Sequence, residues 1–114
     1  MSYQAKGLQA WLFQRLTGVF MVLYILYFLL VLLTTETMTY AAWVAWFSHP
    51  LMNTATGLFY IHLAVHAWVG MRDVVLDYVP NDSLRLTTLA CISFFLIITC
   101  LGVLRILFSL SLNL

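Results

Sequence analysis

The sequence has 114 residues, of which 64% are hydrophobic and only 8% are charged. Soluble chains are about half apolar and about one quarter charged, so this composition excludes a soluble globular protein and indicates an integral membrane protein. The net charge of +1 provides no clustered basic surface and excludes binding to nucleic acid. We expect one all-α domain over residues 1–114, a membrane three-helix bundle with a short interfacial helix between the first and second spans.

The first two predicted elements lie before Pro50. The run from Leu16 to Thr35 is free of charge and matches the roughly 20 apolar residues that cross a bilayer, so we predict a first span over residues 15–35. Between Thr39 and His49, three aromatic residues fall at helical spacing on one face, which is typical of a short helix in the headgroup region. These aromatic residues are Trp43, Trp46 and Phe47.

The second and third predicted spans are separated by Pro80. A proline disfavours helix at the residue before it, so we predict that the second span covers residues 51–79. The polar residues that follow offer an N-cap for a third span over residues 84–106. These capping candidates are Asn81, Asp82 and Ser83.

Basic residues near the predicted helix ends indicate the orientation. Lys6 and Arg15 precede the first span, and Arg72 and Arg85 flank the connection between the second and third spans. Since basic residues favour the cytoplasmic side, we expect the N-terminus in the cytoplasm and the C-terminus on the opposite side. Arg105 near the outer end of the third span is the exception, and the sequence leaves its role open.

Two histidines, His62 and His66, lie inside the second predicted span at a spacing that places them on one helix face. Ionisable side chains at membrane depth are costly, so each is a candidate for function. Three interpretations stay open. The histidines could hydrogen-bond between helices, could form a zinc pair that lacks further ligands on this span, or could include one axial ligand of haem iron.

The haem interpretation requires a second chain. Two axial ligands approach the iron from opposite faces, and two side chains on one face of one helix cannot do that. The other predicted spans contain no histidine, and His49 is expected outside the membrane on the far side. A haem bound to His66 would therefore bridge two chains, and Gly70, one turn later on the same face, would leave room for a flat macrocycle.

A motif in this region resembles a known family. The run His66-Ala67-Trp68-Val69-Gly70-Met71, followed by Asp77-Tyr78-Val79, is similar to the hydrophobic membrane anchor of bacterial succinate dehydrogenase, which is the small cytochrome b subunit of that complex. The run Gln14-Arg15-Leu16-Thr17 falls where that family carries an arginine at the start of its first span. The resemblance covers nearly the whole chain.

The resemblance implies a role for four residues. His66 would be an axial ligand of the iron of a haem b shared with a second membrane-anchor subunit, and Arg15 would lie near the haem propionates. Tyr78 would hydrogen-bond a carbonyl oxygen of ubiquinone, and Asp77 would lie in the vicinity of that quinone. His62 need not be histidine in the family, so the resemblance assigns it no role.

The resemblance also implies a function in electron transport and the tricarboxylic acid cycle. The chain would dock the flavoprotein and iron-sulfur subunits to the bacterial inner membrane as part of a succinate:quinone oxidoreductase. It would hold no complete active site, because it has no flavin fold and no cysteine cluster. Two alternatives stay open: an anchor of fumarate reductase, or a non-redox scaffold or transporter subunit in which the histidines join helices.

Overall fold

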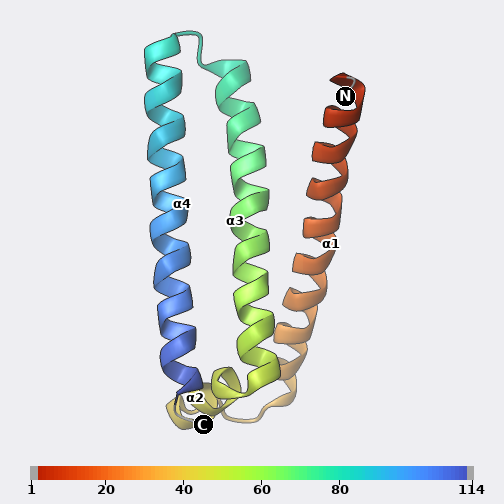
Figure 1. Ribbon diagram of the computed structural model, residues 1–114. Helices are drawn as coiled ribbons and strands as arrows, with labels where there is room; N and C mark the ends of the chain where they lie inside the picture. Colours follow the sequence, from red (N-terminus) through yellow and green to blue (C-terminus); the bar gives the residue numbers. More distant parts are fainter. Residues whose placement is uncertain (1–2, 113–114) are drawn as a thin grey trace.

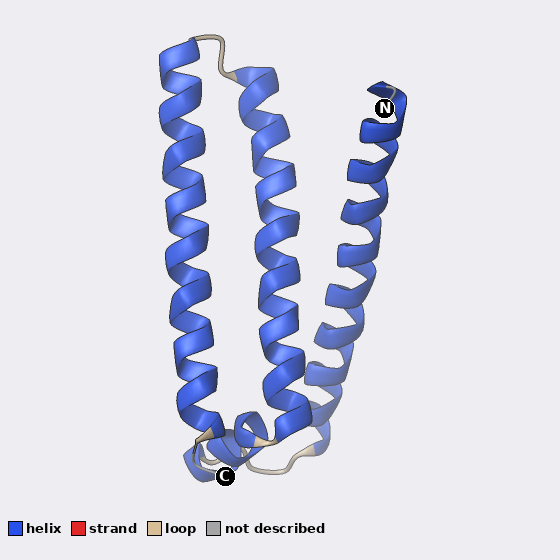
Figure 2. Ribbon diagram, in the orientation of Figure 1, coloured by secondary structure: helices blue, strands red, loops and turns tan. Residues whose placement is uncertain are grey.

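The computed structural model describes residues 3–112, with side chains within residues 7–112, and its regular structure is helical throughout (Figure 2). No strand occurs in these residues, which confirms the predicted all-α class. Three helices are long and one is short. They are α1 (Tyr3–Thr34), α2 (Tyr40–Ser48), α3 (Pro50–Tyr78) and α4 (Asp82–Ser111).

The three long helices run side by side in a row, with α3 in the middle (Figure 1). Helices α1 and α4 both pack against α3, but within residues 3–112 they do not pack against each other. Helix α2 lies across one end of the row, packs against α3 and α4, and contacts α1 through aromatic side chains. The N-terminal end of α1 therefore lies at the end that carries the α3–α4 connection, and the C-terminal end of α4 lies beside α2.

Local sequence signals explain where the helices begin. Thr39, His49 and Asn81 occupy the N-cap positions of α2, α3 and α4, and each side chain accepts a hydrogen bond from a backbone N–H of the first turn. Such caps satisfy donors that have no partner within the helix. Pro50 takes the first position of α3, where its missing N–H costs nothing. Of the three predicted capping candidates, Asn81 is the residue that caps α4.

Among the described residues, two helical segments are long and apolar enough to cross a membrane. They are Gly7–Thr34 in α1, with 28 residues, and Asp82–Ser111, with 30 residues. Helix α3 is not among them, because its 29 residues include several polar side chains in the middle, His62 and His66 among them.

The described part of the chain buries few side chains. The buried apolar residues are Met52, Val75 and Leu107, and the buried polar residues are Thr17 and Ser48. Large apolar side chains are exposed along α1, α3 and α4. Such a surface would be unfavourable in water, so it indicates lipid or protein neighbours around the helices.

An aromatic cluster fills the end of the molecule where α1, α2 and α3 meet. Tyr24 stacks on Phe59 with ring centroids 4.3 Å apart, and Phe28 stacks on Trp46 at 5.2 Å. Each such pair stabilises by about 0.5–1.5 kcal/mol beyond its buried area. We call this set the aromatic cluster, and its members are Tyr24, Phe28, Trp43, Trp46, Phe47 and Phe59.

Three polar contacts stabilise the same end of the molecule. The hydroxyls of Tyr24 and Thr56 lie 2.8 Å apart and join α1 to α3. The Asn53 side-chain amide donates to the carbonyl oxygens of Phe47 at 3.0 Å and Leu107 at 2.8 Å. The Asn53 side chain of α3 therefore hydrogen-bonds both the end of α2 and the last turns of α4.

Candidate functional site

A groove along α1 contains His66. Its volume is about 540 Å³, which is within the usual range of about 300–1,000 Å³ for small-molecule sites. Most of the lining is apolar, with polar groups from one glutamine, one arginine and the histidine. The lining residues are Trp11, Gln14, Arg15, Gly18, Val19, Val22, Leu23 and His66. His66 is the residue that α3 contributes.

The His66 imidazole has one nitrogen engaged with α1. Its Nδ1 lies 3.3 Å from Oγ1 of Thr17, which is 4% exposed. Within the described residues no hydrogen bond engages its Nε2. The ring is therefore fixed on one side and carries a free nitrogen beside the groove.

Two glycines lie where α1 approaches α3. A Cβ atom on Gly18 would stand 3.7 Å from Cε1 of His66, so the glycine leaves space beside the imidazole. A Cβ atom on Gly70 would stand 3.8 Å from Nε2 of Gln14. Part of the room expected beside Gly70 is therefore taken by the Gln14 amide, whose Oε1 is buried without a hydrogen-bond partner within the described residues.

Arg15 lines the same groove as His66. The side chain is exposed, and its guanidinium lies over the Trp11 ring at 5.5 Å from the centroid. A cation in this place is available to an anionic group that enters the groove, because a guanidinium matches a carboxylate with two parallel hydrogen bonds.

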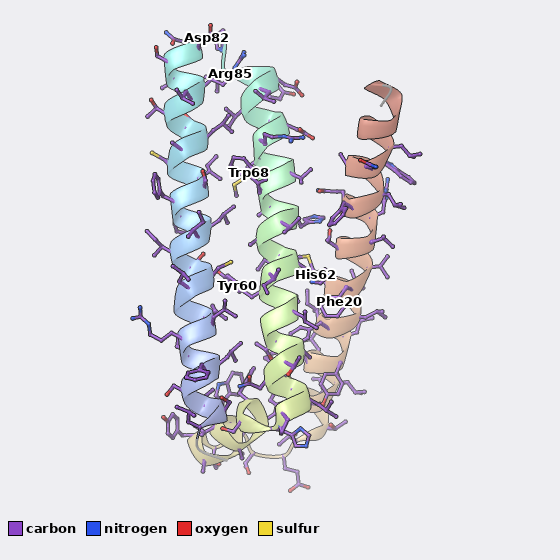
Figure 3. The ribbon with its side chains drawn as sticks, in the orientation of Figure 1. Phe20, Tyr60, His62, Trp68, Asp82 and Arg85 are labelled. Carbon is purple, nitrogen blue, oxygen red and sulfur yellow. The ribbon has the colours of Figure 1, made fainter. Side chains whose placement is uncertain are left out.

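His62 has a different environment one turn earlier on α3. Its Nδ1 lies 2.6 Å from the carbonyl oxygen of Leu58 in the same helix. Its ring packs against Phe20 of α1, with centroids 4.6 Å apart (Figure 3). His62 is not among the residues that line the groove. Its hydrogen bond therefore lies within one helix, and its packing joins two.

The zinc interpretation finds no ligand set. Within the described residues, no three His, Cys, Asp or Glu side chains gather closely enough to hold a metal ion. The groove instead presents a single histidine, His66, with an arginine and an amide. A lone imidazole fits the axial ligation of a metal that arrives within a macrocycle better than it fits a protein-only metal centre.

Tyr78 and Asp77 lie on the last turn of α3, outside the groove. Both are exposed, Tyr78 by 80%. By helix geometry, Tyr78 lies about 18 Å beyond His66 along the axis and about 120° around it. The structure therefore brings Arg15 and His66 together and leaves Tyr78 at the end of the helix.

The connection after Tyr78 is held in place although Tyr78 is exposed. Arg85 donates from Nε and Nη2 to the carbonyl oxygen of Val79, at 3.0 and 2.9 Å. Figure 3 shows Asp82 and Arg85 at this end of the row, where their side chains lie 3.8 Å apart. The two hydrogen bonds from one guanidinium fix the turn that carries the tyrosine.

Sequence reasoning missed two residues at the site. Thr17 and Gln14 enter the sequence analysis only as neighbours of Arg15. The available signal was the position of Thr17 two residues after Arg15. A polar residue inside an apolar span needs hydrogen-bond partners. The Phe13 and Gln14 carbonyl oxygens of α1 supply two, and His66 of α3 supplies a third.

Comparisons with known proteins agree with the resemblance. Residues 1–100 match the family model described as the succinate dehydrogenase/fumarate reductase transmembrane subunit. The chain is also 34% identical over 89 residues to the succinate dehydrogenase hydrophobic membrane anchor subunit of Coxiella burnetii, an alignment that covers 76% of this chain and 77% of the relative. This family and the two apolar helices support a membrane location and an anchor role. The chain belongs to the succinate dehydrogenase/fumarate reductase transmembrane subunit family.

Proposed function

We propose that this chain is a membrane-anchor subunit of a succinate dehydrogenase, and that His66 supplies one axial ligand of a haem b shared with a second anchor chain. The observation that carries the proposal is the groove along α1, where His66 has a free Nε2 beside Arg15. Family membership and the anchor similarity support the same assignment.

The residues of the groove fit a haem. His66 offers a nitrogen ligand, Gly18 leaves space beside the ring, and Arg15 offers a cation for a propionate carboxylate. The buried Oε1 of Gln14 lacks a donor within the described residues, which supports a further chain or a bound water over this groove. A haem bound here would supply a one-electron store inside the membrane. The second axial ligand would come from the second anchor chain.

Helix α3 completes a three-span arrangement in this proposal. It lies between the two apolar helices, and its 29 residues extend about 44 Å, compared with a hydrocarbon layer of about 30 Å. Helix α2 then lies in the headgroup region at the end of the row opposite the α3–α4 connection. Its Trp43 and Trp46 suit that region, where aromatic rings are enriched.

The proposed orientation places the N-terminus in the cytoplasm and the C-terminus in the periplasm of a bacterial inner membrane. Arg72 and Arg85 lie at the same end of the row as the N-terminal end of α1, whereas Arg105 lies toward the other end of α4 as the exception. The catalytic subunits, a flavoprotein and an iron-sulfur protein, dock against this cytoplasmic end.

Tyr78 is the proposed ubiquinone contact, with Asp77 beside it. A phenol donates a hydrogen bond to a quinone carbonyl oxygen without placing a charge in an apolar site. The exposure of Tyr78 leaves its hydroxyl free for a ligand, and the two Arg85 hydrogen bonds hold the turn behind it. The quinone then binds at the cytoplasmic end, where the iron-sulfur protein docks and delivers electrons from succinate.

Succinate oxidation is favoured over fumarate reduction by the similarity to a succinate dehydrogenase anchor. The test is to purify the complex from its natural membrane through a tag on this chain. We expect a flavoprotein, an iron-sulfur protein and a second anchor to co-purify in equal amounts and to reduce ubiquinone with succinate. Recovery of the chain without these partners would contradict the proposal.

A further inference from the structure

We infer, on the basis of the proposed function, that Thr17 is a positioning residue that fixes the tautomer of His66 and lowers the reduction potential of the bound iron. Thr17 is among the few buried side chains of the described chain. It lies on α1 at the level of His66 on α3, 49 residues apart in sequence, and its Oγ1 approaches Nδ1 at 3.3 Å.

The proton positions follow from a count of donors and acceptors around the Thr17 hydroxyl. A hydroxyl has one hydrogen and two acceptor lone pairs. Oγ1 of Thr17 lies 2.8 Å from the carbonyl oxygen of Phe13 and 3.1 Å from that of Gln14, both closer than the histidine. The hydrogen therefore points to these carbonyls, and a lone pair faces the ring. It follows that Nδ1–H of His66 donates to Thr17.

A proton on Nδ1 leaves the lone pair of a neutral imidazole on Nε2, the nitrogen without a partner in the described residues. Metal-bound histidines nearly always donate their other N–H to an acceptor, which orients the ring and raises its basicity. A more basic ligand favours ferric over ferrous iron. Thr17 therefore prepares His66 for iron and lowers the midpoint potential of the haem.

The experiment compares purified complexes that carry one substitution each. Thr17→Val keeps the shape and removes the acceptor, and Thr17→Ser keeps the hydroxyl. Thr99→Val is a matched control, because Oγ1 of Thr99 makes the same paired contacts to Phe95 and Leu96, at 3.0 Å each, within α4. The measurements are the haem midpoint potential and the rate of haem transfer to excess apomyoglobin.

We expect Thr17→Val to raise the midpoint potential and to speed haem transfer about tenfold, the lower end of the usual effect of losing such a partner. Thr17→Ser should keep both the midpoint potential and the transfer rate at the wild-type values, and Thr99→Val should change neither. Equal potentials and transfer rates in Thr17→Val and Thr99→Val would overturn the inference.

If the Thr17→Val complex does not assemble, a second pair of variants still tests the inference. Thr17→Ser and Thr17→Cys differ in one atom, and the thiol is the weaker acceptor. The Cys variant should then have the higher potential, and equal potentials would overturn the inference. A wild-type complex without b-type absorption would contradict the proposed function itself, whereas normal absorption with no response at Thr17 would contradict this inference alone.

Discussion

The interface between α1 and α3 is closed at one end and open at the other. Near α2, Tyr24 stacks on Phe59, its hydroxyl lies 2.8 Å from that of Thr56, and the aromatic cluster fills the remaining space. Beside His66, the same two helices leave a groove of about 540 Å³. The chain therefore fills the first region with its own side chains and leaves the second region open.

The aromatic cluster and the groove at His66 are expected to serve different purposes, the first stability and the second ligand binding. A packed aromatic cluster contributes to the stability of the helices without a partner. The groove contributes little packing and keeps two polar groups, Nε2 of His66 and Oε1 of Gln14, without hydrogen bonds in the described residues. Substitutions in the aromatic cluster should therefore change stability, and substitutions in the groove should change haem binding.

The largest expected effect is the loss of haem from a complex with His66→Leu. Leucine cannot coordinate iron, so the reduced-minus-oxidised spectrum of the purified complex should lose its b-type bands. His62→Leu is the matched control on the same helix face, because His62 bonds to Leu58 and does not line the groove. Loss of the bands in the His62 variant alone would reverse the ligand assignment.

Phe28→Ala should reduce stability without changing the haem spectrum. Phe28 packs against Trp43, Trp46 and Phe47 of α2, so the truncation opens a cavity in the aromatic cluster. We expect a loss of about 2 kcal/mol for this half-buried ring, measured as thermal unfolding of the complex in mild detergent. Phe94→Ala, at an exposed ring of α4, is the control and should leave unfolding unchanged. An altered haem spectrum in Phe28→Ala would break the separation of the two regions.

Tyr78→Phe should slow quinone reduction while the haem remains in place. The change removes one hydroxyl, and a single hydrogen bond stabilises by about 0.5–1.5 kcal/mol, so succinate-driven ubiquinone reduction should fall about 2- to 10-fold. The haem spectrum should not change, because Tyr78 lies outside the His66 groove. Wild-type quinone turnover in this variant would remove Tyr78 from the quinone site.

Arg85→Lys should have the smallest effect, confined to the α3–α4 connection. Lysine keeps the charge but cannot donate the paired hydrogen bonds that Arg85 makes to the Val79 carbonyl. We expect a loss below about 1 kcal/mol, seen as faster amide hydrogen exchange in residues 79–84. Arg72→Lys is the control, since Arg72 pairs with the exposed side chain of its neighbour Asp73 and not with the connection. Equal exchange in both variants would show that Arg85 does not hold the turn.

Local chemistry allowed much of the fold to be predicted from the sequence. Pro50 and Pro80 separate the helices, and Asn81, one of the predicted capping candidates, caps α4, because proline geometry and side-chain acceptors act within a few residues. The apolar composition indicated a membrane protein in the same way, since it depends on no long-range contact. The resemblance through the His66 motif is confirmed by the family match over residues 1–100.

Contacts between helices could not be predicted in this way. Thr17 meets His66, and Gln14 meets Gly70, only because α1 and α3 adopt one relative rotation and register. No periodicity in either helix gives that register, since the apolar faces are not distinct in a chain that is apolar all round. The groove itself was not predicted from the sequence for the same reason. The roles of His66, Arg15 and Tyr78 in binding haem and quinone stay predictions.

We propose that His66 ligates a haem shared with a second anchor chain. The most direct test is the reduced-minus-oxidised absorption spectrum of the wild-type complex, purified with its partner chains. We expect b-type bands with one haem for each pair of anchor chains, and the loss of these bands when the His66 imidazole is replaced. A complete complex that reduces quinone but has no such bands would contradict haem ligation by His66.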